Sequence, residues 1–286
     1  MWKLARPSIA EVDVELNAAL GSKAAGHAES PTEDEKRALW ELYQAYESGG
    51  GRPHDSYKGK GMRAEFLQLI HDGYKQVQDN GRLATLRSAI KLGASECPYC
   101  GFGPIEDLDH HLQKGIYKLL SIFPLNLVPA CATCNRGKPR APDPSGSRQL
   151  FNVYLEDCTG NTFFVVRAAI DPVSGGLMLK FCIEKATGMS QEVFERLQHH
   201  LEIFRLQERL LHQANLYLGN FEVPLADQFR FGGAASVKDF LERCSAANAK
   251  RHGLNDWRTA LMTGLAECEE FCAGGFLNAL GYPNSQ

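Results

Sequence analysis

Residues 97–138, CPYCGFGPIEDLDHHLQKGIYKLLSIFPLNLVPACATCNRGK, contain two Cys-x-x-Cys pairs, Cys97 with Cys100 and Cys131 with Cys134. A short turn of this kind brings two sulfur atoms to one ion, so two such pairs supply four thiolates to a tetrahedral zinc ion. Between the pairs lie 30 residues, more than is usual in a zinc ribbon. The sequence therefore predicts a structural Zn²⁺ site that frames a small folded element.

Polar residues with catalytic chemistry gather within this segment. Between the cysteine pairs lie Asp109, His110, His111 and Asn126, and Asn135 directly follows the last cysteine. A neutral imidazole takes a proton from water near pH 7, and a hard cation neutralises the charge on a leaving oxygen. These residue types could together serve a hydrolysis assisted by a metal ion. The alternative is a plain zinc ribbon in which the polar residues are incidental.

The order of four short elements gives the segment a family resemblance. CPYCG, DLDHH, PLNLVPAC and CATCNRGK follow one another as in zinc-framed HNH endonucleases, and residues 96–140 closely resemble that family. The resemblance implies a ββα-metal core, in which a β-hairpin carries an acid–histidine pair and a helix carries the last metal-binding residue. It also implies a metal-dependent endonuclease that cuts DNA, mostly duplex DNA, and leaves a 5′-phosphate and a free 3′-hydroxyl.

The resemblance further implies a role for each polar residue. Asp109 would bind the catalytic ion and His110 would be the general base, while Asn126 would brace the loop and orient His110. Asn135 would complete the metal site in place of the family's usual histidine, and two oxygen ligands favour Mg²⁺ or Mn²⁺. In an alternative assignment His110 is a ligand and His111 is the base. The first assignment is preferred because an oxygen ligand already precedes His110.

Basic residues surround the motif, although the whole chain has a formal net charge of −3. The range 110–140 contains no Asp or Glu. We expect its basic side chains to contact a phosphate backbone; those predicted to do so are Lys114, Lys118, Arg136 and Lys138. The predicted partner is therefore a nucleic acid.

A finer resemblance concerns biological context. The segments LDHHLQK and FPLNLVPAC-x-x-CN are similar to those of HNH nucleases in bacterial anti-phage defence systems such as the Septu type. In these systems an ATPase accompanies the nuclease. This similarity implies a defence effector that works with an ATPase or sensor partner. Two other functions stay open: a non-catalytic zinc-ribbon module that binds nucleic acid, and an RNA-directed HNH nuclease.

The chain divides into four expected regions of an α+β protein. A flexible lead-in covers 1–30, because GSKAAGHAES is rich in small residues, and a helical region follows at 31–95. The nuclease core with its zinc knuckles occupies 96–140. Region 141–286 is expected to contain a β-hairpin, from TFFVVRAAI and LMLKFCIE, and then helices that would dock a partner.

Composition places the protein among soluble globular proteins, with 44% hydrophobic and 23% charged residues. The first residues lack the apolar core of a signal peptide, and no apolar run reaches the ~18 residues that a membrane span needs. The nine cysteines are an odd number and do not suggest a disulfide framework. We therefore expect a cytoplasmic protein with no membrane partner.

Overall fold

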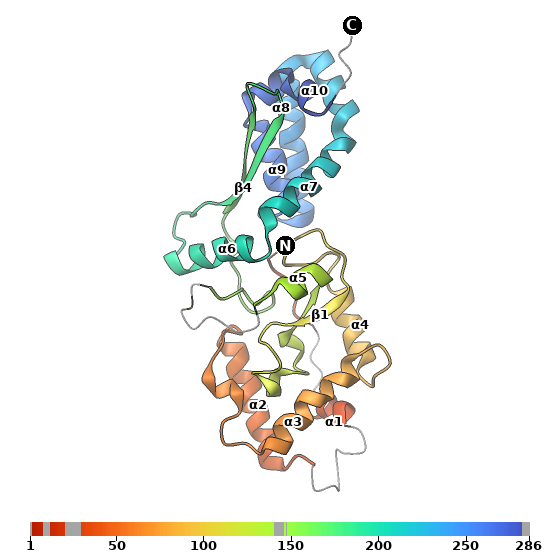
Figure 1. Cartoon of the computed structure of the whole chain (residues 1–286), viewed down its shortest axis with the longest axis vertical. Helices are drawn as coiled ribbons and strands as arrows, with labels where there is room; N and C mark the ends of the chain where they lie inside the picture. Colours follow the sequence, from red (N-terminus) through yellow and green to blue (C-terminus); the bar gives the residue numbers. More distant parts are fainter. Residues whose placement is uncertain (1, 8–11, 21–29, 140–145, 147, 282–286) are drawn as a thin grey trace. The chain divides into compact units, whose positions relative to one another are not determined.

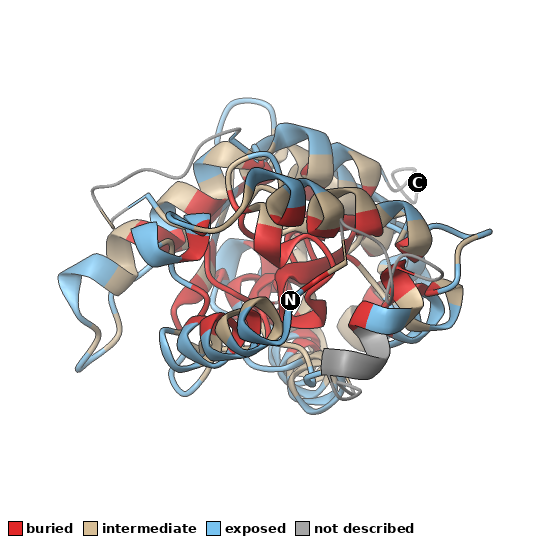
Figure 2. Ribbon diagram, turned by 90° about the horizontal axis from the view of Figure 1, so that it is seen from below, coloured by how far each residue is buried: buried red, intermediate tan, exposed pale blue. Residues whose placement is uncertain are grey.

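The computed structural model describes residues 2–7, 12–20, 30–139, 146 and 148–281. The chain is a mixture of helices and small sheets, and it forms two compact units (Figure 1). The N-terminal unit comprises residues 2–99 and 103–157, and the C-terminal unit comprises 100–102 and 158–286. In Figure 2 the buried residues lie on the inward sides of the elements and the exposed ones on their outward sides.

The N-terminal unit consists of short helices around one two-stranded sheet. Its helices are α1 (Val12–Leu20), α2 (Glu33–Ser48), α3 (Ala64–Gly73), α4 (Ala84–Leu92) and α5 (Ala132–Gly137), with 3-10 turns at Asp55–Lys58, Tyr74–Val77, Lys118–Leu120 and Pro124–Asn126. Strands β1 (Asp107–His110) and β2 (Leu127–Ala130) pair antiparallel, with His110 opposite Leu127. Helix α5 follows β2 directly, so the order through the predicted core is strand, strand, helix.

Helix α2 is tied to the sheet by its buried face. It begins at a capping box, in which the Thr32 side chain accepts from the backbone of Glu35 and the Glu35 side chain accepts from the backbone of Thr32. Its Tyr43 hydroxyl donates to the carbonyl of Leu119, and its Tyr46 hydroxyl donates to Asn126. The loop between β1 and β2 is therefore anchored on α2.

Part of the expected flexible lead-in is a packed helix. Residues 12–20 form α1, and its Leu16 and Leu20 are buried. The Arg82 guanidinium donates to the carbonyls of Ala18 and Ala19, which lie at the helix end where carbonyls lack partners within the helix. Burial and these two hydrogen bonds explain why residues 12–20 form a helix within the expected lead-in 1–30. Residues 21–29 of the lead-in lie outside the described residues.

The C-terminal unit contains the second sheet and the longer helices. Strands β3 (Phe164–Ile170) and β4 (Leu177–Ile183) form an antiparallel pair, which confirms the predicted β-hairpin. The helices are α6 (Gln191–Ile203), α7 (Leu206–Leu218), α8 (Glu222–His252), α9 (Trp257–Ala266) and α10 (Phe276–Ala279), with a 3-10 turn at Gly219–Phe221 and a π turn at Phe271–Gly275. Arg205 separates α6 from α7 with a positive φ of 50°.

Helix α9 packs so closely on β3 that only glycine fits at position 264. A Cβ atom added there would lie 2.2 Å from the carbonyl oxygen of Val166. We expect Gly264→Ala to lower the free energy of unfolding by at least about 2 kcal/mol, because backbone must move to relieve the overlap.

Gly219→Ala is the matched control for this test. Gly219 has helical φ, and a Cβ there meets nothing within 4 Å, so we expect stability to stay the same or rise by less than about 1 kcal/mol. Urea denaturation measures both variants, and equal destabilisation would contradict the packing of α9 on β3.

Candidate functional site

The four paired cysteines come together in one buried cluster. Their sulfur atoms all lie within 4.8 Å of one another. A tetrahedral zinc ion with Zn–S bonds of about 2.3 Å holds its sulfurs about 3.8 Å apart, so only a small contraction is needed. The cluster of Cys97, Cys100, Cys131 and Cys134 can therefore hold a structural metal such as zinc.

The cysteine cluster is connected directly to the polar residues of the motif. Tyr99, inside the first Cys-x-x-Cys pair, donates its hydroxyl to Asp109 Oδ2 at 2.8 Å. Cys131 is the N-cap of α5, where its Sγ accepts from the backbone N–H of Cys134 at 3.4 Å. The cluster thus fixes both a neighbour of Asp109 and the start of the helix that carries Asn135.

Asn126 ties together the two ends of the loop between β1 and β2. Its side chain is fully buried, and its Oδ1 accepts from the backbone N–H of Leu112 at 2.7 Å and from the Tyr46 hydroxyl at 3.0 Å. Its Nδ2 donates to the carbonyls of Leu112 and Leu120 at 3.0 and 3.1 Å. Both amide protons and the oxygen are satisfied, so the loop that carries Ser121 is held in one conformation.

His110 is held in one tautomer by this loop. Its Nε2 lies 3.0 Å from the carbonyl oxygen of Ser121, which can only accept, so Nε2 carries the proton and Nδ1 is the acceptor. The imidazole also meets the ring of Tyr74 edge-on, with centroids 4.3 Å apart. Burial lowers the pKa of His110 to about 3. The imidazole is therefore neutral at pH 7.

Asp109 is a buried carboxylate with a buried counter-ion. Lys138 Nζ lies 2.6 Å from Asp109 Oδ2 and also donates to the carbonyl of His110. Burial raises the pKa of Asp109, and the Lys138 ammonium and the Tyr99 hydroxyl oppose that rise. Burial also lowers the pKa of Lys138. The phosphate contact predicted for Lys138 would require its ammonium to leave this pair.

Asn135 is oriented by a residue that the sequence did not single out. Its Nδ2 donates to Asp107 Oδ2 at 3.0 Å, which turns its Oδ1 away from that carboxylate. Asp107 and Asp109 lie two residues apart on β1, so they share one face of the strand. The alternation Asp-x-Asp on a strand was the signal that could have identified Asp107.

A hollow of about 730 Å³ in the N-terminal unit brings most of the predicted site residues together. Its walls include the predicted Asp109, His110, Lys114, Asn135, Arg136 and Lys138, together with His71 and Tyr74 at the end of α3, which the sequence did not indicate. No motif spacing links these two residues to the cysteine pairs, because they reach the hollow through tertiary packing of α3.

Besides the four cysteines, three predicted site residues lie outside the walls of this hollow. Asn126 and His111 are buried, and the backbone N–H of His111 donates to the carbonyl of Asn126 at 2.7 Å. Lys118 donates to Gln68 at 3.0 Å. The geometry therefore brings His110 rather than His111 to the hollow, and it separates Lys118 from the other basic residues.

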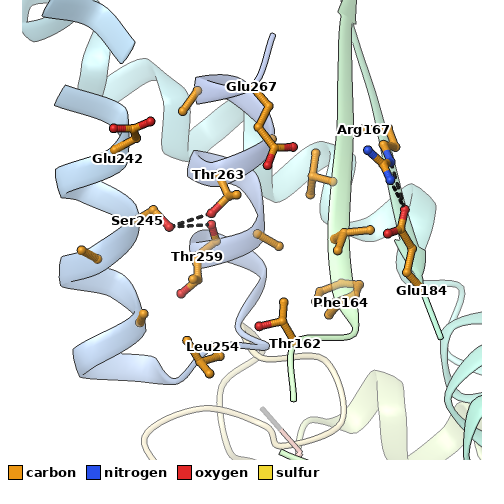
Figure 3. A pocket seen from close by; sticks show the side chains of 17 residues that line it. Thr162, Phe164, Arg167, Glu184, Glu242, Ser245, Leu254, Thr259, Thr263 and Glu267 are labelled. Carbon is orange, nitrogen blue, oxygen red and sulfur yellow. Dashed lines mark hydrogen bonds and ion pairs between the residues drawn. The ribbon is translucent and has the colours of Figure 1, made fainter. Parts of the chain in front are cut away.

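A second hollow, of about 510 Å³, lies in the C-terminal unit between α8, α9 and β3 (Figure 3). Ser245 Oγ is 2.7 Å from Thr263 Oγ1 within it, and Arg167 pairs with Glu184 at its edge. Its lining contains no histidine or cysteine. The hollow around His110 brings an imidazole together with carboxylate and amide oxygens, and it is therefore the candidate active site.

Comparison with known proteins gives one distant relative to report. The chain is 26% identical to Protein ea31 of Escherichia phage lambda over 192 residues, which cover 63% of this chain and 64% of that protein. The match thus spans less than two thirds of the relative. No protein-family profile and no solved structure matches the chain. In the described part of the chain, no helix has both the length and the apolar character that a membrane crossing requires.

The cysteine cluster predicts one tightly bound zinc ion per chain. We expect Cys134→Ser to lose that ion and to melt at a lower temperature, because a structural site contributes its binding free energy to folding. Cys244→Ser is the matched control, since Cys244 lies outside the cluster. Metal analysis and thermal melting measure both variants, and full zinc content in Cys134→Ser would exclude this site.

The partly buried imidazole of His110 predicts a pH dependence of stability. The folded-state pKa, about 3, lies below the unfolded value of about 6.5, so the unfolded chain takes up a proton first as the pH falls. The contribution of the neutral His110 imidazole to the free energy of unfolding is fully present above pH ~6.5. It is lost as the pH falls toward 3. We expect His110→Gln to lose less stability than wild type between pH 7.5 and pH 5, measured by urea denaturation.

The control for this pH test is His212→Gln, because His212 is exposed on α7. We expect it to follow the wild-type pH profile. If His110→Gln and wild type lose equal stability over this range, the low pKa of His110 is wrong.

Proposed function

We propose that this protein is a zinc-framed, metal-dependent HNH endonuclease that hydrolyses phosphodiester bonds in DNA. One observation carries the proposal: a neutral imidazole of fixed tautomer lies in the same hollow as the oxygen donors Asp109 and Asn135. The order β1, β2, α5 around these residues is consistent with the ββα-metal core that the sequence predicts.

The donor set fits a hard divalent cation. Carboxylate and amide oxygens are ligands that Mg²⁺ and Mn²⁺ accept, and both Asp109 and Asn135 line the hollow. Lys138 already pairs with Asp109, so a bound cation would have to share this carboxylate with the ammonium or displace it. A bound Mg²⁺ or Mn²⁺ would supply the neutralisation of charge on the phosphate and on the leaving oxygen.

His110 would perform the proton transfer. Its Nδ1 would accept a proton from the attacking water. Burial lowers the pKa of His110 and opposes this step, while the Nε2–H bond to the Ser121 carbonyl raises that pKa and favours the imidazolium that forms. Asn126 keeps the Ser121 carbonyl in place through the loop. Lys114 and Arg136 line the same hollow and would contact the phosphate backbone.

A non-catalytic nucleic-acid-binding module is the second candidate. It is favoured by the contacts of Asp109, whose Oδ2 accepts from both the Tyr99 hydroxyl and the Lys138 ammonium. RNA is the alternative substrate for the same centre. The defence role and the ATPase partner remain predictions from the sequence resemblance.

The test is cleavage of supercoiled plasmid DNA by the zinc-loaded protein in Mg²⁺ or Mn²⁺. We expect nicking or linearisation that requires the added ion and falls at least about 100-fold in His110→Ala, because a general base contributes about 10²–10⁴ in rate. His111→Ala distinguishes the alternative base. A structured RNA under the same conditions tests the other substrate.

His212→Ala, on the exposed surface of α7, is the matched control and should cut as wild type does. If cleavage persists in His110→Ala and disappears in His111→Ala, the general base is His111 and not His110. If wild type binds DNA but cuts neither DNA nor RNA, the binding module is the better account.

A further inference from the structure

Tyr74 contacts the candidate base from outside the cysteine-framed motif. It is the first residue of the 3-10 turn that follows α3, and it lines the hollow together with His110. The aromatic ring meets the imidazole edge-on, with an interplanar angle of 63° and centroids 4.3 Å apart. The N-terminal helical region thus supplies part of the wall of the candidate active site.

Two further contacts fix the Tyr74 ring. Its hydroxyl donates to the carbonyl of Leu108 at 3.2 Å, and Leu108 lies on the same strand as His110. The ammonium of Lys114 lies 4.5 Å from the ring centroid, a distance at which a cation is attracted to the ring face. Tyr74 therefore takes its position from β1 itself and also orders a basic side chain of the hollow.

His110 needs such a neighbour because its hydrogen bond fixes only one ring atom. The bond from Nε2 to Ser121 holds one end of the imidazole, but the ring can still swing about its side-chain bonds unless packing prevents it. Tyr74 supplies that packing through its edge-on contact with the imidazole. Without the Tyr74 ring, the His110 imidazole would rotate and Nδ1 would no longer keep one orientation.

We infer that Tyr74 is a positioning residue that holds the His110 imidazole with Nδ1 available to the hollow. The inference rests on the proposed function, in which Nδ1 accepts the proton. The aromatic ring is the required group, and the hydroxyl contributes less, because the edge-on contact belongs to the ring. α3 and its following turn are therefore part of the active site.

The test compares variants that keep the ring with variants that remove it, in the full-length, zinc-loaded chain. We expect Tyr74→Phe to keep kcat within about twofold of wild type. We expect Tyr74→Met and Tyr74→Leu to lose about tenfold or more in kcat, because a misplaced base slows the chemical step, while KM stays within about threefold of wild type. Tyr217→Leu removes a half-buried tyrosine from the C-terminal unit and should leave both constants unchanged.

A readout independent of cleavage is the ¹⁵N spectrum of the histidine rings in the same proteins without added Mg²⁺ or Mn²⁺. We expect wild type and Tyr74→Phe to show His110 as the single Nε2–H tautomer, and the Met and Leu variants to show exchange broadening or mixed tautomers. Either ring-deletion variant suffices, provided that its thermal melting shows it to be folded.

The two readouts separate failure of this inference from failure of the proposed function. If wild type cuts no nucleic acid but ring deletion still loosens His110, the nuclease is wrong and the positioning role of Tyr74 stands. If ring deletion leaves the tautomer and kcat unchanged, or raises KM alone, Tyr74 does not position His110 and the inference is overturned.

Discussion

The candidate site depends on the convergence of four cysteine sulfurs from two segments that are 30 residues apart. The first segment brings Tyr99 to Asp109, and the second begins α5, which carries Asn135 and leads to Lys138. The strands between them are only four residues each and could not be independently stable. A metal ion held by the four cysteines would close the loop between them and would stabilise this small element.

The hollow lies beside the cysteine cluster and contains buried polar groups. Each of these groups alone costs free energy when it is removed from water. The Asp109–Lys138 pair removes two charges from water, and such a pair is tolerated when both partners have further hydrogen bonds, as Tyr99 and the His110 carbonyl provide here. Asn126 satisfies its amide completely within the loop. The result is a wall in which His110 stays neutral while charged groups surround it.

The features that the sequence predicted are formed by residues that lie close together in the chain or within one motif. The cysteine cluster, the β3–β4 hairpin and the shared hollow of Asp109, His110 and Asn135 all follow from residues close in sequence or from one motif. Tyr74 was not predictable, because it meets His110 only through tertiary packing of α3. The pairing of Lys138 with Asp109 was missed because charge counting cannot distinguish a buried counter-ion from a phosphate ligand. The hydrogen bond from Arg82 to the end of α1 likewise joins residues that are far apart in sequence.

The central claim is that a zinc-framed hollow holds a hard divalent cation beside a neutral His110. Paramagnetic broadening by Mn²⁺ tests it most directly, in zinc-loaded protein with ¹⁵N-labelled histidine and asparagine side chains. The account predicts that substoichiometric Mn²⁺ selectively broadens the signals of Asn135 and His110, that those of His212 on α7 stay sharp, and that excess Mg²⁺ reverses the effect. If Mn²⁺ leaves Asn135 and His110 as sharp as His212, the hollow does not bind the ion and the account is contradicted.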